Sequence, residues 1–347
     1  MNNGKITWKS PSNIAIVKYW GKYGHQLPKN TSVSFTLDNA HSITTLSWSP
    51  ASTENPAGIS FYFEGSKNPA FENRIQKFIS GIQEAYFPFL KDYFLLFESS
   101  NSFPHSSGIA SSASGMSAIA LCLCSMEQAL IGSLSDEAQF YHKASIVARM
   151  GSGSASRSVF PVMAVWGQHT AIGGSSNEFA IPFGEYIHPV FRTFHDDILI
   201  ISHKEKSVSS TAGHHLMEGN PYATARYQQA NNRITQIAQI LKDGDIEAFG
   251  LLAEAEALTL HALMMCSEPS YMLMEPASMI VIKKIQQFRT DSNLPVYFTL
   301  DAGPNIHILY PENDEKTVNE WISQELKQHC AGGKIIRDKV GHGPAKL

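Results

Sequence analysis

A stretch rich in glycine and serine, PHSSGIASSASG at residues 104–115, contains the residue types in this sequence that most directly suggest chemistry. An apolar pattern typical of a helix follows at once, from Ala113 to about Leu130. Small residues let the backbone approach an oxyanion closely, and the first N–H groups of a helix are unpaired and lie at its positive end. We interpret the stretch as the phosphate-binding loop of a nucleotide-dependent enzyme. The alternative is a serine-rich helix cap, and the G-x-x-x-x-G-K-[ST] pattern of a P-loop does not occur.

A second stretch, GSGSASRS at residues 151–158, combines serine hydroxyls and open backbone N–H groups with one arginine. It superficially resembles a dinucleotide fingerprint, but it follows a predicted helix rather than a strand, and Ser156 stands where the third glycine belongs. The fork of Arg157 can hold a carboxylate or phosphate through two parallel hydrogen bonds. The alternative is a flexible connection that carries a surface arginine.

Asp301 begins the segment DAGPN, which interrupts a run that otherwise reads as a buried strand. A carboxylate at the end of a buried strand is costly unless it is paired or functional. Asp301 is therefore a candidate base, proton acceptor or metal ligand, and a turn that begins with aspartate is the alternative.

The segment SNIAIVKYWGK at residues 12–22 reads as a strand with two lysines near its end. Lys18 is expected on the same face as Ile14 and Ile16, partly buried and able to pair with a carboxylate. Tyr19 and Lys22 are candidate anion contacts, although a strand followed by solvated lysines is the alternative. A further small polar loop, SVSSTAG at residues 207–213, is by itself more typical of a helix cap.

The bulk composition is that of an ordinary globular protein, since 43% of its 347 residues are hydrophobic and 17% are charged. The length favours two domains, and the net charge of -4 argues against a protein that coats nucleic acid. The four cysteines form no C-x-x-C pair, and the fourteen histidines show no metal-binding spacing, which disfavours a disulfide scaffold or zinc site. No secretory signal and no run of roughly 18 apolar residues is evident, so a cytoplasmic protein is expected.

Strands and helices are mixed along the whole chain, which predicts an α+β protein. The expected strands are residues 42–49, 59–63, 93–98, 162–166, 197–203, 296–300 and 306–310. The expected helices, besides the one that follows the first stretch, are residues 70–86, 136–150, 222–241, 246–265, 277–289 and 312–329. The glycine- and proline-rich residues 173–189 form a plausible boundary.

Taken together and in this order, these stretches resemble the GHMP small-molecule kinase superfamily, and within it the diphosphomevalonate decarboxylase family. The matching segments are PSNIAIVKYWGKYG (11–24), LPKNTSVS (27–34), FPHSSGIASSASG (103–115), ARMGSGSASRSVF (148–160), SVSSTAG (207–213), LTLHALMMCSEPSYMLMEP (258–276) and YFTLDAGPN (297–305). The KYWGK, GSGSxxRS and DAGPN stretches are specific to the decarboxylase branch, and the resemblance covers nearly the whole chain.

The resemblance implies a two-domain GHMP kinase fold. Residues 1–190 would form the ribosomal-S5-like, ATP-binding N-terminal domain, and residues 191–347 the ferredoxin-like C-terminal domain, with the active site between them. The implied reaction is ATP-dependent decarboxylation of (R)-5-diphosphomevalonate to isopentenyl diphosphate, ADP, phosphate and carbon dioxide, as in the mevalonate pathway of isoprenoid biosynthesis. ATP and Mg²⁺ are the implied cofactors, a homodimer is the usual assembly, and no metal-ligand set is predicted.

The resemblance also implies roles for individual residues. Asp301 corresponds to the carboxylate that orients or deprotonates the 3-hydroxyl, Arg157 to the arginine that grips the substrate carboxylate, and Lys18 to a lysine near the reacting centre. The implied substrate-binding residues are Tyr19, Lys22, Ser152, Gly153, Ser154 and Ser210. The implied ATP-binding residues are Ser106, Ser107, Gly108, Ala110, Ser111 and Ser112.

The sequence departs from the family pattern at four places. Residues 160–162 read Phe-Pro-Val where many relatives have an aromatic residue and two glycines, and residues 105–107 read His-Ser-Ser where Thr-Ala-Ala is usual. Thr211 stands where some bacterial relatives have arginine, and His214 replaces a common methionine. These changes concern the residues expected to contact the terminal phosphates rather than those expected to act at C3.

Several alternatives stay open at this point. A sister decarboxylase acting on 5-phosphomevalonate would keep Lys18, Arg157 and Asp301 and differ only in its diphosphate contacts. A kinase that stops at the 3-phosphate would lack the Asp/Lys pair, and a non-catalytic ligand sensor would have lost Asp301 or the phosphate loop. A serine hydrolase is disfavoured because no G-x-S-x-G motif occurs.

Overall fold

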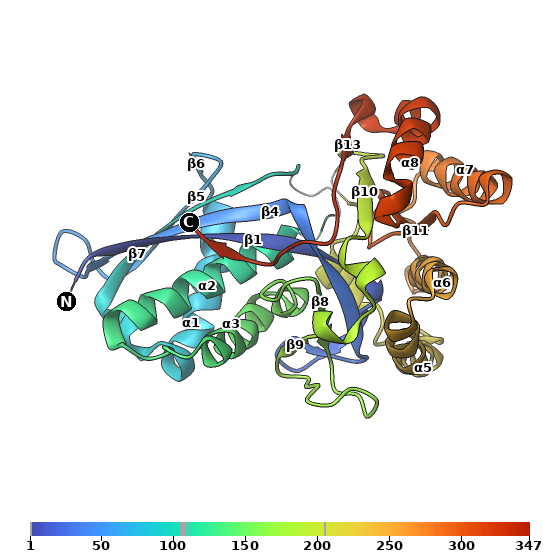
Figure 1. Cartoon of the computed structure of the whole chain (residues 1–347). Helices are drawn as coiled ribbons and strands as arrows, with labels where there is room; N and C mark the ends of the chain where they lie inside the picture. The colour runs from blue at the N-terminus through green and yellow to red at the C-terminus, as the bar shows by residue number, and fades with distance from the viewer. Residues whose placement is uncertain (1, 105–108, 110, 205) are drawn as a thin grey trace.

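The computed structural model describes residues 2–104, 109, 111–204 and 206–347. In this described part of the chain, two antiparallel-rich sheets carry helices and lie side by side, which confirms the α+β class (Figure 1). The eight-stranded sheet has the order β14-β1-β4-β7-β5-β6, with β8 and β9 attached beside β4. The four-stranded sheet has the order β11-β12-β10-β13. The predicted domain boundary at residue 190 stays a prediction.

Two long antiparallel strands, β1 (Gly4–Val17) and β4 (Ser32–Pro50), form the backbone of the larger sheet. Its other strands are β5 (Gly58–Phe63), β6 (Ser66–Lys67), β7 (Tyr93–Asn101), β8 (Met163–Trp166), β9 (Ala180–Pro182) and β14 (Ala345–Lys346). The helices α1 (Pro69–Tyr86), α2 (Ser111–Ile131) and α3 (Glu137–Gly151) cover one face (Figure 1). Because β14 pairs with β1, the C-terminal end of the chain returns to the sheet in which the chain begins.

The smaller sheet consists of β10 (His195–Leu199), β11 (Tyr297–Thr299), β12 (Ile306–Tyr310) and β13 (Ile335–Ile336). Its helices are α4 (Ser210–His215), α5 (Ala223–Asp243), α6 (Ile246–Met265), α7 (Pro276–Ser292) and α8 (Glu315–Trp321). One core cluster joins the two sheets, since it contains Ile16 and Phe35 of the larger sheet together with Ile198 of the smaller and Phe249 of α6. The two layers therefore share buried apolar surface, which holds them as one body.

Shorter elements complete the described part. A short hairpin pairs two strands of two residues each, β2 (Lys22–Tyr23) and β3 (Leu27–Pro28). Short 3₁₀ helices lie at Pro88–Asp92, Gly153–Ser156, Gly184–Tyr186, Pro189–Arg192, Glu312–Asp314, Lys327–His329 and Ala331–Gly333.

Local signals account for the helix ends. The Asn68 side chain accepts a hydrogen bond from the N–H of Phe71 at 3.0 Å and caps α1, with proline in the first turn. Asp245 caps α6 in the same way, accepting from the N–H of Ala248 at 3.0 Å. Helix α5 ends at Gly244, whose φ of 78° is the left-handed conformation that glycine adopts readily. These caps explain why the predicted helices agree closely with the observed ones.

Three expectations need correction. The strand predicted at residues 42–49 begins already at Ser32: residues 32–37 alternate polar and apolar side chains, with Val33, Phe35 and Leu37 buried in the core and Ser32 and Ser34 accepting hydrogen bonds from Arg157. The helix predicted at residues 312–329 is interrupted by a π-helical turn at Ile322–Leu326 and ends in 3₁₀ geometry. Strand β1 ends at Val17, so Lys18 lies beyond the strand and is fully buried rather than partly buried.

Two helices, α2 and α6, are long and apolar enough to cross a membrane by length and composition alone, contrary to the expectation from the sequence. Most of each lies buried inside the protein. Both are apolar because they pack on several sides within the core, and a helix that is hydrophobic all round is as typical of a protein interior as of a membrane.

Val162 adopts a left-handed backbone conformation with a φ of 61°, which is unusual for a β-branched residue. Its N–H donates to the carbonyl of Gly341 at 2.9 Å, and its carbonyl accepts from the N–H of Thr36 at 3.0 Å, so the surroundings hold this conformation. It stands at one of the two positions where, by the resemblance described above, many relatives are expected to carry glycine.

We therefore expect Val162→Gly to raise the free energy of unfolding by about 1 kcal/mol. Relief of the backbone strain stabilises the folded state by more than the extra conformational entropy of glycine stabilises the unfolded chain. Urea denaturation measures the effect. Val162→Ala is the control, since it keeps the Cβ atom and should bring no gain. A glycine variant less stable than the alanine variant would contradict the assignment of strain.

Candidate active site

A cleft lies where the end of β1, the start of α2, the loop after α3, the start of α4 and the loop after β11 come together. Its empty volume, counted together with the part open to solvent, is ≈ 840 Å³. The predicted site residues that line it are Lys18, Tyr19, Lys22, Ser112, Ser152, Gly153, Ser154, Arg157, Ser210 and Asp301. Five stretches far apart in the sequence thus contribute to one cavity.

Lys18 and Asp301 form an ion pair in this cleft, with the Lys18 Nζ 3.0 Å from the Asp301 Oδ1. The lysine side chain is 1% exposed, whereas the carboxylate is 26% exposed and so reachable from the cleft. Burial raises the pKa of the Asp301 carboxyl, but the Lys18 charge, helped by His307 and Lys206, outweighs burial and holds the pKa below its ordinary value. Asp301 is therefore ionised at neutral pH and can accept a hydrogen bond or a proton.

Arg157 is a buried residue and not the surface arginine of the alternative interpretation. Its guanidinium donates to the Ser34 hydroxyl at 2.8 Å, to the Ser32 hydroxyl at 2.6 Å and to the Asn13 carbonyl oxygen at 3.2 Å. Burial lowers the pKa of Arg157 to about 10, against the opposing charge of Asp301, so the group stays protonated at neutral pH. Three of its five N–H donors are occupied, two have no partner among the residues that the structure describes, and Arg157 lines the cleft.

The two serine-rich stretches meet at the rim of the cleft, where the Ser112 and Ser152 hydroxyls lie 3.2 Å apart. A Cβ atom on Gly153 would come within 2.5 Å of the Trp166 ring and 3.1 Å of the Tyr19 hydroxyl, so the close packing of this loop requires glycine. The buried Tyr19 hydroxyl has no hydrogen-bond partner among the described residues, and burial raises its pKa. The hydroxyl groups of Ser112, Ser152 and Tyr19, which come from three different segments, thus lie around the same cleft.

His214 joins α4 to the lysine-rich segment that follows β1. Its Nδ1 accepts a hydrogen bond from the N–H of Gly21 at 2.9 Å, and its ring packs between Tyr19 and Trp20 at centroid distances of 4.4 and 4.5 Å. Burial, with help from the charge of Lys22, lowers the pKa of His214 to about 3. The neutral ring therefore fixes the backbone that leads to Lys22.

We expect this histidine to make stability depend on pH. In the unfolded chain His214 protonates below about pH 6.5, whereas in the folded protein it stays neutral down to about pH 3. The unfolded state binds more protons in that window, so the free energy of unfolding rises with pH through it. His214→Gln, which keeps an acceptor for Gly21, should lower that slope by up to about 1.4 kcal/mol per pH unit in urea denaturation. An unchanged slope would contradict the neutral, buried state of His214.

The structure also adds residues that sequence reasoning missed. Arg74 on α1 and Lys206, which follows β10, both line the cleft. Burial lowers the pKa of both side chains, and the charge of Asp301 partly opposes the shift at Lys206. Neither residue stands in a recognisable motif, because a lone basic residue on a helix or in a loop is ordinarily a solvated charge.

The predicted ATP-binding residues Ser106, Ser107, Gly108 and Ala110 lie outside the described residues. Ser111 and Ser112 form the first turn of α2, and both line a second cavity of ≈ 600 Å³. Arg74 and Ser112 border both cavities, so the two adjoin at the start of α2. The second cavity combines the rings of Phe61, Phe63 and Phe71 with the polar side chains of Ser99 and Asn101.

No group of three or more His, Cys, Asp or Glu side chains is arranged to hold a metal ion within the described ranges. Mg²⁺ that arrives with a nucleotide needs only one or two protein oxygens besides phosphates and water. The Asp301 carboxylate and the Ser112 hydroxyl, which both line the cleft, supply ligands of that kind. The cleft therefore suits a magnesium–nucleotide complex.

Comparison with known proteins places the chain in a family. Residues 10–178 match the diphosphomevalonate decarboxylase-like N-terminal domain, and residues 197–345 match the mevalonate 5-diphosphate decarboxylase C-terminal domain. The diphosphomevalonate decarboxylase of Gibberella zeae is 30% identical over 337 residues, covering 92% of this chain and 84% of that protein.

Solved structures show the same relationship. The structure of MDDEF in complex with MVAPP, AMPPCP and magnesium has a TM-score of 0.83 at 26% identity, covering 100% of this chain and 99% of that chain. The mevalonate diphosphate decarboxylase of Staphylococcus aureus has a TM-score of 0.84 at 26% identity, covering 100% and 98%. The fold is thus the two-domain GHMP fold, and this chain belongs to the diphosphomevalonate decarboxylase family.

Proposed function

We propose that this protein catalyses the ATP-dependent decarboxylation of (R)-5-diphosphomevalonate to isopentenyl diphosphate, ADP, phosphate and carbon dioxide, a step of the mevalonate pathway. The observation that carries the proposal is the partly exposed Asp301 carboxylate, paired with Lys18, in a cleft whose other charged lining residues, among those the structure describes, are all basic. The related structure in complex with MVAPP, AMPPCP and magnesium supports the same substrate and nucleotide.

Asp301 acts at the 3-hydroxyl of the substrate. Its ionised oxygen orients that hydroxyl and accepts its proton as the oxygen attacks the γ-phosphorus of ATP, forming the 3-phosphate and ADP. Lys18 holds the carboxylate ionised and in place at 3.0 Å. The bound proton then returns to solvent.

Loss of the 3-phosphate leaves positive charge at C3, and loss of carbon dioxide from C1 delivers the electron pair that becomes the new double bond between C2 and C3. The negative charge of Asp301 stabilises the developing positive charge electrostatically. The two free N–H donors of Arg157 suit the substrate carboxylate, which they orient for departure. No redox change occurs, and ATP supplies the leaving group.

Basic side chains of the cleft attract the phosphate groups of the substrate and of ATP. Besides Lys18 and Arg157, the cleft is lined by Lys22, Arg74 and Lys206, against the single acidic side chain of Asp301 among its described lining residues. Such an excess of positive charge attracts the diphosphate, the substrate carboxylate and ATP together. Tyr19, Ser152, Gly153, Ser154 and Ser210 add hydroxyl and backbone contacts for the substrate.

The start of α2 is the proposed ATP phosphate site. Ser111 and Ser112 present hydroxyls and unpaired helical N–H groups there. The adjoining cavity, lined by phenylalanine rings with Ser99 and Asn101, suits a purine base. Mg²⁺, which neutralises phosphate charge during transfer, would be held by the nucleotide together with Asp301 or Ser112.

We further propose a homodimer that works in the cytoplasm. The family resemblance supports the dimer. The four cysteines are unpaired, and Cys122, Cys124 and Cys330 are buried thiols, which suits a reducing compartment. Light scattering of the purified protein tests the assembly, and a monomer at micromolar concentration would contradict the dimer.

Turnover with ATP tests the function. The protein is offered 5-diphosphomevalonate, 5-phosphomevalonate and mevalonate in separate reactions, and ADP and carbon dioxide are followed together. Equal amounts of both products from the diphosphate alone are expected. Preference for 5-phosphomevalonate would identify the sister decarboxylase, ADP without carbon dioxide would identify a kinase, and the absence of ADP from every reaction would favour a non-catalytic sensor.

A further inference from the structure

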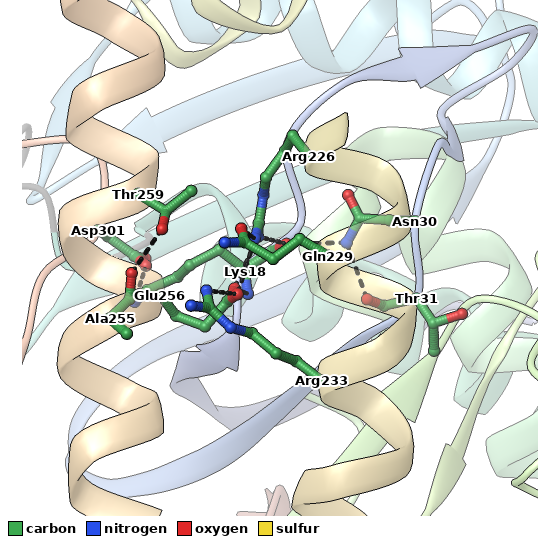
Figure 2. Close-up of polar contacts among 10 residues, drawn as sticks. All are labelled: Lys18, Asn30, Thr31, Arg226, Gln229, Arg233, Ala255, Glu256, Thr259 and Asp301. Carbon is green, nitrogen blue, oxygen red and sulfur yellow. Dashed lines mark hydrogen bonds and ion pairs between the residues drawn. The ribbon is translucent and has the colours of Figure 1, made fainter. Parts of the chain in front are cut away.

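Glu256 on α6 is a fully buried carboxylate beside the active site, and the mechanism above does not use it. Figure 2 shows the side chains of Arg226 and Arg233, together with Lys18, converging on it. Its two oxygens accept hydrogen bonds from Arg226 at 2.6 and 2.7 Å and from Arg233 at 2.6 Å. Removing these charges from water costs free energy, so a buried ion cluster of this kind adds little net stability by itself. Its role is therefore to be sought in the groups that it contacts.

The cluster holds the backbone of Lys18. The Lys18 N–H donates to the Glu256 Oε2 at 2.7 Å, and the Lys18 carbonyl accepts from Arg226 at 3.1 Å and from the Asn30 amide at 2.9 Å. Lys18 lies just beyond the end of β1, so these side chains take the place of a strand partner for its peptide groups. Both polar backbone groups of the lysine are thereby fixed, and its side chain is directed to Asp301 (Figure 2).

Helix α6 also holds the other member of the pair. The Nε2 of His261, five residues after Glu256, lies 3.1 Å from the backbone carbonyl of Asp301. Burial lowers the pKa of His261 to about 4, so at neutral pH the ring is uncharged and its N–H donates to that carbonyl. One helix therefore contacts the backbone of Lys18, from the first part of the chain, and that of Asp301, from the last.

We infer that Glu256, with Arg226 and Arg233, is a positioning residue for catalysis: it locks the backbone of Lys18 so that the ammonium group meets Asp301 in the geometry that proton acceptance requires. This inference rests on the proposed function. Reactions are sensitive to misplacement of about 1 Å, so loosening this lock lowers the rate of the chemical step more than the binding of substrate.

The chain offers a matched control on the same helix. Glu254 is also buried and pairs with Arg289 at 2.7 Å, but it has no contact with Lys18 among the interactions of the described residues. Glu254→Gln and Glu256→Gln each remove one charge from a buried Glu–Arg pair in α6. If both glutamates only stabilised the fold, the two substitutions would have the same effect on kcat.

We expect Glu256→Gln to lower kcat about 10- to 100-fold with little change in KM for ATP or substrate, and Glu254→Gln to leave kcat unchanged. Glu256→Asp should restore part of the rate. In a Lys18→Met background, Glu256→Gln should cause no further loss, because the residue acts through Lys18. Equal effects of the two glutamine variants, or a full additional loss in the Lys18→Met background, would overturn the inference.

A second readout needs no turnover. Lys18, Lys206 and His307 act on the Asp301 carboxyl, Arg157 and His261 also interact with its charge, and His261 contacts its carbonyl. A carbon-13 NMR titration should show a higher pKa for Asp301 in Glu256→Gln than in the wild-type protein or in Glu254→Gln, because a loosened Lys18 no longer holds the carboxylate ionised. An unchanged Asp301 pKa would overturn the inference, even if the wild-type protein showed no turnover and the proposed function failed.

If Glu256→Gln does not fold, Arg233→Gln tests the same point more gently, because it removes one of the two arginines that hold Glu256 and leaves Arg226 in place. A lower kcat with unchanged KM is expected. Wild-type kcat and an unchanged Asp301 pKa in a folded Arg233→Gln protein would overturn the inference.

Discussion

Asp301→Asn should lower kcat by about 10³-fold while the protein still folds. Asparagine has nearly the shape of aspartate and can still accept a hydrogen bond from Lys18 through its amide oxygen. It cannot accept a proton from the 3-hydroxyl, and it leaves the buried Lys18 ammonium without a counter-charge. Because Asp301 is 26% exposed to the cleft, water can solvate part of the change. Release of ADP and carbon dioxide from ATP and 5-diphosphomevalonate measures the loss.

The pH dependence checks the same assignment. Asp301 has a folded-state pKa below its ordinary value, so it stays ionised, and its contribution persists, as the pH falls from neutral toward that ordinary value. The contribution is lost only when the pH falls through the depressed pKa. An acid limb of kcat that belongs to Asp301 should therefore lie below about pH 4. Wild-type-like turnover by Asp301→Asn would exclude Asp301 as the base.

Arg157→Ala should reduce kcat/KM for 5-diphosphomevalonate by about 10²- to 10³-fold, since it removes the group that orients the substrate carboxylate. The KM for ATP should change little. The variant also leaves the Ser32 and Ser34 hydroxyls and the Asn13 amide without their donor, so the free energy of unfolding should fall by about 2 kcal/mol.

Arg157→Lys separates charge from geometry at this position. Lysine keeps the positive charge but cannot reproduce the fork that contacts Asn13, Ser32 and Ser34. Most of the loss in kcat/KM should remain, and steady-state kinetics with each substrate varied in turn measures it. A rise in the KM for ATP with no change for 5-diphosphomevalonate would place Arg157 on the nucleotide instead.

Much of the fold could be predicted from local patterns. The bounds predicted for the helix at residues 246–265 agree with α6, and those for the strand at residues 306–310 agree with β12. Both have strong periodicity and clear end signals. The prediction missed the start of β4, although its residues 32–37 alternate polar and apolar, and it missed the π-helical turn at Ile322–Leu326 inside the helix predicted at residues 312–329.

The residues of the candidate site likewise fall into those that local sequence indicated and those that it did not. Residue types alone singled out Asp301, Arg157 and the serine stretches, because a carboxylate at a strand end or an arginine among hydroxyls is chemically unusual. Arg74, Lys206 and Glu256 were missed, because isolated charges on helices or loops carry no such signal. Their importance depends on what surrounds them, and short-range sequence does not encode it.

The amino-acid order is sufficient for the helices, the loops rich in small residues and the charged side chains that can do chemistry, since caps, periodicity and turn residues act over a few positions. The positions of these groups relative to one another do not follow from such short-range signals. Lys18 and Asp301 are 283 positions apart, and only the folded chain, in which α6 packs against both β1 and β11, brings them to 3.0 Å. Their pairing, and the depressed pKa that results, come from burial and long-range contacts that exist only in the folded chain.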